Sequence, residues 1–280
     1  MYMRKKMMDN LMKFWLLISV SITIGVSFFI IYHIFSNGWR SISLEFLLSS
    51  PKGMPLGTEG GIFPAIMGSL ALGIISMLVA SILGIATAIY LTFYCKSTAF
   101  HSFTRVVIQC IAGIPSIVLG LFGYAFFVVF LGMGYSLLAG ALTLSIMIFP
   151  VVAVNTEKTL TEIRKEQMMA SYALGVSKSY TFFKVILPYQ KNDILSGILL
   201  GTLYAMGATA PIMLTAAVLS ATTPSSLLQP VMALPYHLYI LASTNISLEN
   251  AYGTALVLLL ILLISYTFAT ILFLRKSRDI

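Results

Sequence analysis

The chain has 280 residues, of which 59% are hydrophobic and only 9% are charged, and its formal net charge is +8. A soluble domain carries about 25% charged residues, so this composition and a mean hydropathy of +0.96 exclude an ordinary soluble domain and indicate a membrane protein. The basic residues lie at the ends of apolar runs, as in membrane proteins, and do not form the basic and aromatic clusters of nucleic-acid modules, so no nucleic acid is expected as a partner.

Six apolar runs, long enough to cross a bilayer as helices, follow one another along the chain. The first is too long for a signal peptide and has no small-residue cleavage site after it, so we expect an uncleaved helix. The second opens with Pro64, which a first helical turn tolerates. Pro115, Pro150 and Pro211 fall inside later runs, as kinks or as flexible points along a transport path. The expected spans are about 14–36, 62–94, 106–131, 135–154, 194–219 and 251–274.

The distribution of basic residues assigns a side to each connection. With six spans, fifteen of the 17 Lys and Arg share one side, and only Arg40 and Lys52 lie on the other. Cytoplasmic connections carry this excess of basic residues, so both termini are predicted to be cytoplasmic. The predicted organisation is a cytoplasmic N-terminus (1–13), a first transmembrane helix (14–36), an external segment (37–61), a transmembrane domain (62–274) containing a cytoplasmic loop (155–193), and a cytoplasmic C-terminus (275–280).

The cytoplasmic loop 155–193 is the longest polar break between the apolar runs and carries six Lys and Arg. Its pattern predicts a helix, a break at Gly175, a second short helix capped by Ser177, and a stop at Pro188. Long ordered loops are usually functional. In the second helix, the aromatic side chains of 180, 182 and 183 between Lys178 and Lys184 suit either a groove on a partner protein or a lipid surface.

Cysteine and histidine residues give no sign of a metal or redox site. Cys95 and Cys110 are the two cysteines, and His33, His101 and His237 are isolated, with no metal-ligand spacing. We interpret all five as packing or interfacial residues and expect no cofactor. The spans carry almost no ionisable residues, which argues against an ion-coupled carrier.

The loop 155–193 resembles the cytoplasmic coupling loop of ABC-importer permeases. That motif is Glu-Ala-Ala, three residues, Gly, nine residues and Ile-x-Leu-Pro, and here Met169-Ala170-Ser171, Gly175 and Val185-Ile186-Leu187-Pro188 stand at the same spacing. Met169 replaces the motif glutamate, and Glu166 lies one turn earlier on the same helix face. The resemblance implies a coupling helix that docks on a separate ATPase through Glu166, Met169, Ala170, Ser171, Gly175, Lys178, Tyr180, Phe183, Leu187 and Pro188.

Further motifs resemble the permease subunits of phosphate importers. They are Gly60–Ile66, Gly113–Val118, Gly120–Gly123, Phe149–Val152 followed by Asn155-Thr156-Glu157, Thr209-Ala210-Pro211 with Leu214-Thr215-Ala216, and Leu234-Pro235 with Tyr239. The Ala-Pro followed by Leu-Thr-Ala favours the PstA-type subunit over its PstC-type partner. The resemblance implies an all-α membrane protein with the six-helix fold of type I ABC-importer permeases.

The same resemblance implies a division of labour among several chains. A PstC-type permease would complete the pore, ATPase subunits would hydrolyse ATP, an external binding protein would deliver phosphate, and membrane lipid would surround the spans. The chain itself is not expected to be an enzyme, because it lacks the Gly-x-x-x-x-Gly-Lys-Ser/Thr loop that cradles nucleotide phosphates. The alternatives are a permease for molybdate or sulfate and a non-transporting scaffold or sensor.

One departure concerns the pore. The phosphate permeases carry an arginine and, four residues later, a glutamate in the fifth helix, and Tyr204 and Ala208 stand at those positions here. Three explanations are open: the partner permease supplies the charges, the substrate differs, or transport is altered. Dehydrated phosphate would then need hydroxyl and backbone N–H donors. The candidate path residues are Ser116, Tyr204, Gly207, Thr209, Pro211 and Thr215, each of which could equally be a packing residue.

Overall fold

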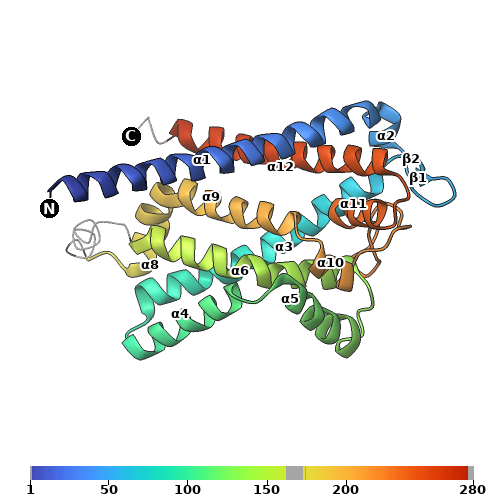
Figure 1. The fold of residues 1–280 in the computed structure, drawn as a ribbon. Helices are drawn as coiled ribbons and strands as arrows, with labels where there is room; N and C mark the ends of the chain where they lie inside the picture. The colour runs from blue at the N-terminus through green and yellow to red at the C-terminus, as the bar shows by residue number, and fades with distance from the viewer. Residues whose placement is uncertain (1, 162–172, 174, 277–280) are drawn as a thin grey trace.

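The computed structural model describes residues 2–161, 173 and 175–276 (Figure 1). Helices dominate this part of the chain, with one two-stranded antiparallel ribbon. The elements are α1 (Tyr2–Gly38), η1 (Trp39–Ser41), α2 (Leu44–Leu48), β1 (Pro51–Lys52), β2 (Glu59–Gly60), α3 (Phe63–Ile89), η2 (Tyr90–Tyr94), α4 (Thr98–Ala112), α5 (Ser116–Gly123), η3 (Tyr124–Phe130), α6 (Leu137–Thr161), α8 (Lys178–Thr181), η4 (Phe182–Ile186), α9 (Leu187–Met206), α10 (Ala210–Thr215), α11 (Leu234–Ser243) and α12 (Leu248–Lys276).

Long apolar helices make this a multi-pass membrane protein. Within the described residues, 4 helices are long and apolar enough to cross a membrane, and a bent pair of shorter helices would be a fifth span. The four spans are Asn10–Ser41, Phe63–Tyr94, Leu137–Thr161 and Leu248–Phe268, and the bent pair is Thr98–Ala112 with Ser116–Phe130. They correspond to five of the six expected runs. The remaining run, 194–219, is divided between α9 and α10.

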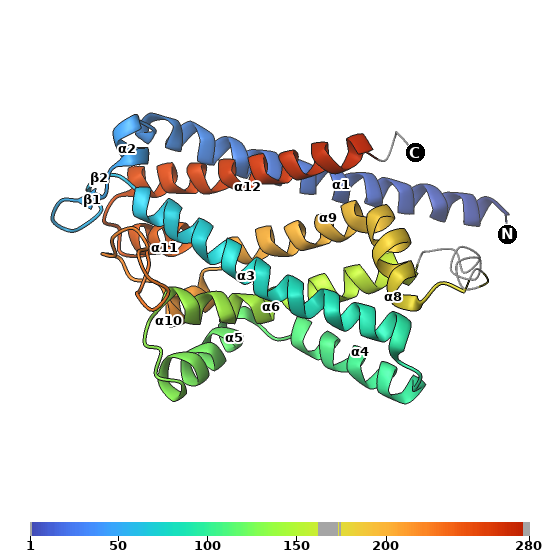
Figure 2. The same ribbon diagram turned by 180° about the vertical axis from the view of Figure 1, so that it is seen from behind.

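The core forms where α3, α6 and α9 pack together (Figures 1 and 2). Small residues recur on the buried face of α3 about every four positions, from Gly68 through Ser76 and Ala80 to Gly84 and Ala88. They allow close approach of the neighbouring backbones, which is how helices associate in membranes. A Cβ on Gly84, for example, would lie 2.8 Å from a methyl carbon of Val152 on α6.

The third expected span, about 106–131, is a bent pair of helices, and the bend falls at Pro115, which was expected as a kink or a flexible point. α4 begins earlier, at Thr98, with the Ser97 hydroxyl accepting from the Phe100 N–H at 3.3 Å. After Ala112 the chain bends by 96° before α5 begins. Pro115 causes the break, because proline disfavours helical geometry at the residue before it and occupies the N-cap position of α5.

Two boundaries of the cytoplasmic loop also differ from expectation. α6 continues to Thr161, so the helix of the fourth span extends into the loop. Pro188 does not end a helix, because it lies in the first turn of α9 and η4 runs directly into that helix. Pro188 cannot donate to the helix ladder, but it directly follows the π-helical segment η4, where the regular α-helical hydrogen-bond pattern is already interrupted.

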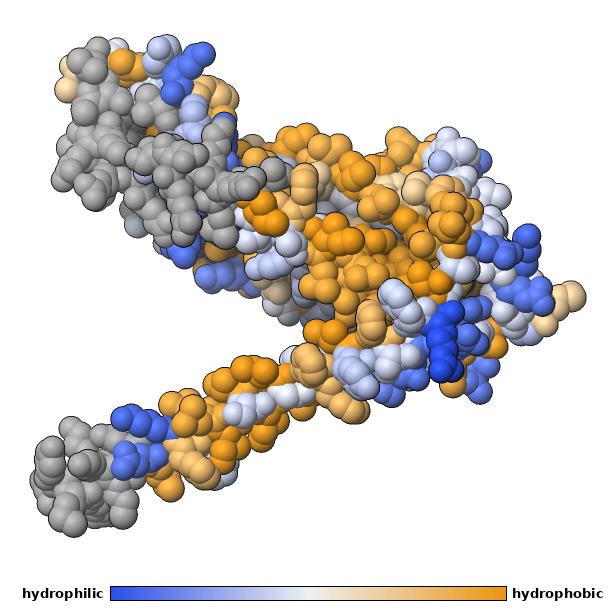
Figure 3. Space-filling model, turned by 90° about the horizontal axis from the view of Figure 1, so that it is seen from above, coloured by the Kyte–Doolittle hydropathy of each residue, from blue (hydrophilic) through white to orange (hydrophobic). Residues whose placement is uncertain are grey.

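α1 is an arm that contacts the rest of the molecule near its C-terminal end. None of its most apolar 18-residue window is buried. His33 Nε2 lies 3.2 Å from the Tyr252 hydroxyl of α12, and a Cβ on Gly38 would lie 2.5 Å from the Tyr252 carbonyl oxygen. Figure 3 shows the arm as a row of hydrophobic side chains diverging from the body, with hydrophilic residues gathered where the two join.

α11 and the segments beside it form the end of the molecule opposite the loop 155–193 (Figure 1). His237 of α11 is buried, and burial lowers its pKa to about 4, so this histidine is a neutral packing residue. Asn250 donates to the Gly57 and Thr58 carbonyl oxygens at 2.8 and 3.1 Å, which holds the β1–β2 ribbon against α12. The interpretation of His237 as a packing residue is confirmed.

Candidate coupling and translocation site

The described part of the cytoplasmic loop begins with a break at Gly175. Its φ of +72° is a left-handed conformation that glycine adopts without strain, so the predicted break is confirmed. Ser177 accepts from the Tyr180 N–H at 3.3 Å, which confirms the predicted cap. From Lys178 the chain is helical without interruption to Met206. The predicted contacts Glu166, Met169, Ala170 and Ser171 lie outside the described residues.

The aromatic residues after Gly175 divide into an exposed pair and a buried anchor. Tyr180 and Phe183 are 57% and 61% exposed, whereas Phe182 is 5% exposed. The Phe182 ring meets Phe93 of η2 edge to face at 5.8 Å. Phe182 therefore fixes the short helix to the membrane domain, and Tyr180 and Phe183 remain available to a partner. Leu187 is half-buried, and Pro188 is exposed.

A buried carboxylate ties α4 to the helix that enters the loop. Glu157 of α6 is 3% exposed. Its Oε1 lies 3.1 Å from His101 Nε2 and 3.3 Å from Arg105 Nε, both on α4. The two bases share a helix face because they are four residues apart. Sequence reasoning missed this cluster, because His101 was interpreted as isolated and Glu157 only as part of a motif.

We expect Glu157→Gln to lower the thermal unfolding temperature of the purified protein, because it removes the charge that binds both bases. Hydrogen bonds to charged groups contribute about 1.5–3 kcal/mol, and the partial exposure of Arg105 and His101 places the loss at the lower end. The exposed Glu59, which makes no ion pair with another described residue, supplies the control variant Glu59→Gln. Equal unfolding temperatures for the two variants would contradict a stabilising role of the cluster.

Three of the predicted path residues lie where α5 and α10 pack together. A Cβ on Gly120 of α5 would lie 3.0 Å from the Pro211 Cα of α10, so glycine allows the two helices to pack closely here. Ser116 begins α5 one turn before Gly120 and is half-buried. Thr209 is the N-cap residue of α10, but its side chain makes no capping hydrogen bond. Ser116 and Thr209 are thus the first residue of α5 and the N-cap residue of α10, the two helices that meet at Gly120 and Pro211.

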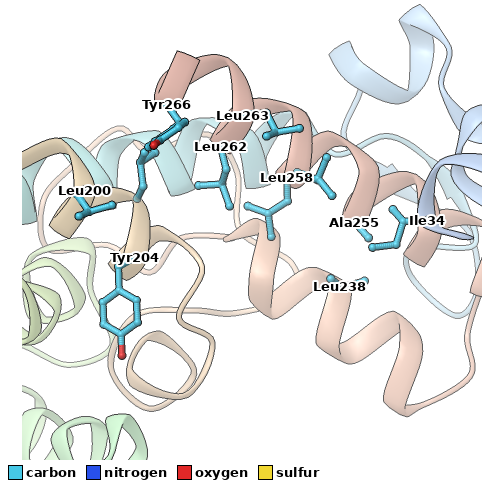
Figure 4. A pocket seen from close by; sticks show the side chains of 11 residues that line it. Ile34, Leu200, Tyr204, Leu238, Ala255, Leu258, Leu262, Leu263 and Tyr266 are labelled. Carbon is cyan, nitrogen blue, oxygen red and sulfur yellow. The ribbon is translucent and has the colours of Figure 1, made fainter. Parts of the chain in front are cut away.

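The other predicted path residues have different surroundings. Thr215 is fully buried, and its hydroxyl donates to the Pro211 carbonyl oxygen at 2.8 Å. Gly207 ends α9. Tyr204 is 63% exposed at the end of an apolar groove between α9 and α12, and its ring extends away from Leu262 and Leu263 (Figure 4). The structure thus places Ser116, Thr209 and Pro211 at the starts of two helices that pack together at Gly120, and Tyr204 beside the apolar groove.

Comparisons with known proteins identify relatives of the chain. Residues 82–278 match the model of the family described as binding-protein-dependent transport system inner membrane component. The chain is 37% identical to the probable phosphate transport system permease protein PstA of Methanocaldococcus jannaschii over 74% of this chain and 73% of that protein. It is 30% identical to the phosphate transport system permease protein PstA of Pasteurella multocida over 89% and 88% of the two chains.

A solved structure supports the fold. The structure of the MetNI methionine ABC transporter in an inward-facing conformation matches with a TM-score of 0.64. The match covers 75% of this chain and 93% of that chain at 16% identity. Identity this low supports the shared fold alone, and the ligand of that transporter does not carry over.

Proposed function

Because the chain belongs to the family of binding-protein-dependent transport system inner-membrane components, we propose that it is the permease subunit of an ATP-driven importer of inorganic phosphate. Phosphate is proposed as the substrate because the chain is 37% identical, over 74% of its length, to a relative named as a phosphate transport permease. The relative from Pasteurella multocida, at 30% identity over 89% of the chain, has the same name. No such support exists for a molybdate or sulfate permease.

The proposed importer distributes its tasks over several chains. A separate ATPase hydrolyses ATP, and an external binding protein delivers phosphate. A PstC-type permease completes the pathway. The charge distribution supports cytoplasmic termini and a cytoplasmic loop 155–193, with Arg40 and Lys52 as the external cations.

The ATPase docks on the helix that follows Gly175. The glycine turn and the Ser177 cap fix the direction of the helix, and the buried Phe182 fastens it to η2. Tyr180 and Phe183 then project as apolar anchors into a groove of the ATPase. Motion of the ATPase reaches the membrane domain in two ways, through the unbroken helix from Lys178 to Met206 and through the Glu157 cluster on α6.

Phosphate passes between the two permeases, in contact with polar groups near the α5–α10 junction. The hydroxyls of Ser116 and Thr209 and the backbone N–H groups at the start of α5 and α10 can donate to the phosphate oxygens. With Tyr204 and Ala208 in place of an ion pair, the positive charge that accompanies phosphate comes from the second permease.

Transport by the reconstituted complex tests the function. The chain is co-expressed with a PstC-type permease and an ATPase, placed in liposomes, and supplied with the binding protein and radiolabelled phosphate. We expect uptake that requires both ATP and the binding protein and that excess molybdate and sulfate do not block. ATP turnover without phosphate accumulation, or full inhibition by molybdate or sulfate, would contradict the proposal.

A further inference from the structure

Two hollows lie along α12, one between it and the end of α1 and the other between it, α9 and α11. The first has a volume of about 550 Å³ and is lined by polar side chains, among them Asn37 and Arg40 from the end of the arm and Glu249 and Tyr252 from the start of α12. The second has a volume of about 520 Å³ and is lined almost wholly by apolar side chains. They come from one face of α12 between Ala255 and Tyr266, from α9 (Leu200, Leu203 and Tyr204), from Leu238 of α11 and from Ile34 of α1.

The two hollows follow one face of α12. Tyr252, Ala255, Leu259 and Leu262 recur at intervals of three and four residues, which places them in one row along a helix. On α1, Ile34 of the apolar hollow and Asn37 of the polar hollow are also three residues apart. Figure 4 shows Ile34 beside Ala255, with the leucines continuing along α12. We call this combined surface the α1–α12 groove.

The polar end of the α1–α12 groove lies at the level of a membrane interface. The candidate span of α1 ends at Ser41, directly after Arg40. Trp39 is 61% exposed beside it and stacks on Phe35 with ring centroids 5.3 Å apart. Exposed tryptophan and tyrosine gather at the depth of lipid headgroups. The polar hollow is therefore at headgroup depth, and the apolar hollow lies within the hydrocarbon layer.

The charged side chains in the polar hollow match a headgroup that carries both signs. Arg40 and Glu249 are exposed, and neither makes an ion pair with another described residue. A guanidinium binds a phosphodiester, and a carboxylate binds an ammonium group. Asn37 directs its amide nitrogen to the His33 carbonyl oxygen at 2.8 Å, which leaves its side-chain oxygen able to accept from an amine. A free phosphate ion would be repelled by Glu249 and would leave the apolar hollow empty.

We propose that the α1–α12 groove binds one phospholipid whose headgroup carries an amine. Its phosphate contacts Arg40, its amine contacts Glu249 and Asn37, and one hydrocarbon chain follows Ala255 to Leu262. None of the most apolar 18-residue window of α1 is buried against the rest of the protein. A lipid bound at the junction of α1 and α12 explains how α1 keeps a fixed angle to the body. Figure 3 shows that a space opens between the arm and the body, and the lipid headgroup lies where the two join. The apolar end of the site includes Tyr204, but no residue of α5 or α10 lines it, so the site lies outside the proposed phosphate path at the α5–α10 junction and does not depend on the substrate.

Lipid retention tests the headgroup contacts. The assembled transporter is extracted in mild detergent from membranes containing phosphatidylethanolamine and phosphatidylglycerol, and native mass spectrometry counts the bound lipids. We expect one phosphatidylethanolamine retained per chain, and Arg40→Gln to weaken its retention about tenfold through the lost charged contact. Lys52→Gln, which removes the other external cation, should leave retention unchanged. Equal retention by the two variants, or displacement of the lipid by millimolar inorganic phosphate, would overturn the proposal.

A photo-reactive side chain tests the occupant of the apolar hollow directly. Placed at Ala255 in the complete complex, it should form adducts whose added mass is that of a phospholipid. The same side chain at Ile264, which is 66% exposed and does not line the hollow, should capture no single lipid species preferentially. An adduct from position 255 to the second permease would show that a protein helix fills the groove, and the proposal would then be wrong.

Discussion

Replacing Gly175 with valine is expected to remove most phosphate uptake while the protein still inserts in the membrane. The φ of +72° is a conformation that a β-branched residue adopts only with strain of about 1–3 kcal/mol. The turn will relax to a different geometry and redirect the helix that carries Tyr180 and Phe183. Since 1.4 kcal/mol is a factor of ten in affinity, we expect about tenfold or greater weakening of ATPase association. Co-purification of the ATPase and proteoliposome uptake measure the two effects.

Gly134 provides a matched control for this variant. Its φ is +62°, and none of the described residues lies within 4 Å of a Cβ at either glycine, so valine introduces the same backbone strain without a clash at both positions. Gly134 lies in the turn before α6, at the end of the helix remote from the loop 155–193. Gly134→Val should reduce thermal stability similarly but leave ATPase association intact. If the ATPase co-purifies equally with both variants, the glycine turn has no docking role.

Local signals in the sequence predicted much of the fold. The family and the all-α permease fold are confirmed, because long apolar runs and the motif series are properties of the chain itself. The break at Gly175 and the cap at Ser177 are confirmed for the same reason, since each depends on residues a few positions apart. The site residues taken from the resemblance stay predictions.

Boundaries that depend on neighbouring helices were predicted less well. Pro115 was identified as a kink inside a span, yet it produces a 96° bend because α5 turns to pack on α10 through Gly120. Pro188 was interpreted as a stop although the helix continues through it, because proline usually marks a helix boundary and nothing in the neighbouring residues announces the π-helical segment before it. The Glu157 cluster joins residues far apart in the sequence, and no local pattern announces such a pair.

Replacing Gly68 with valine is expected to prevent folding of the membrane domain. Gly68 lies on the buried face of α3 where it crosses the segment before α11, and a Cβ there would overlap the carbonyl oxygen of Met232. The obstacle is backbone, so no side-chain rotation relieves it. The nearby Ser69 hydroxyl accepts from the Leu234 N–H at 2.8 Å, and this bond would be pulled apart as the segment moved. Overpacking a core usually lowers the free energy of unfolding by about 1–3 kcal/mol. The backbone clash and the lost hydrogen bond lower the stability of Gly68→Val further.

The amount of folded protein in detergent, measured by size-exclusion chromatography and thermal unfolding, reports the effect of Gly68→Val. Gly25→Val is the matched control, because Gly25 is also within a membrane helix and no described residue lies within 4 Å of a Cβ there. That variant should accumulate like the wild type. If Gly68→Val, like the control, accumulated and unfolded at the wild-type temperature, the close packing of α3 on the segment before α11 would be contradicted. The small residues along α3 would then not be explained by close helix packing.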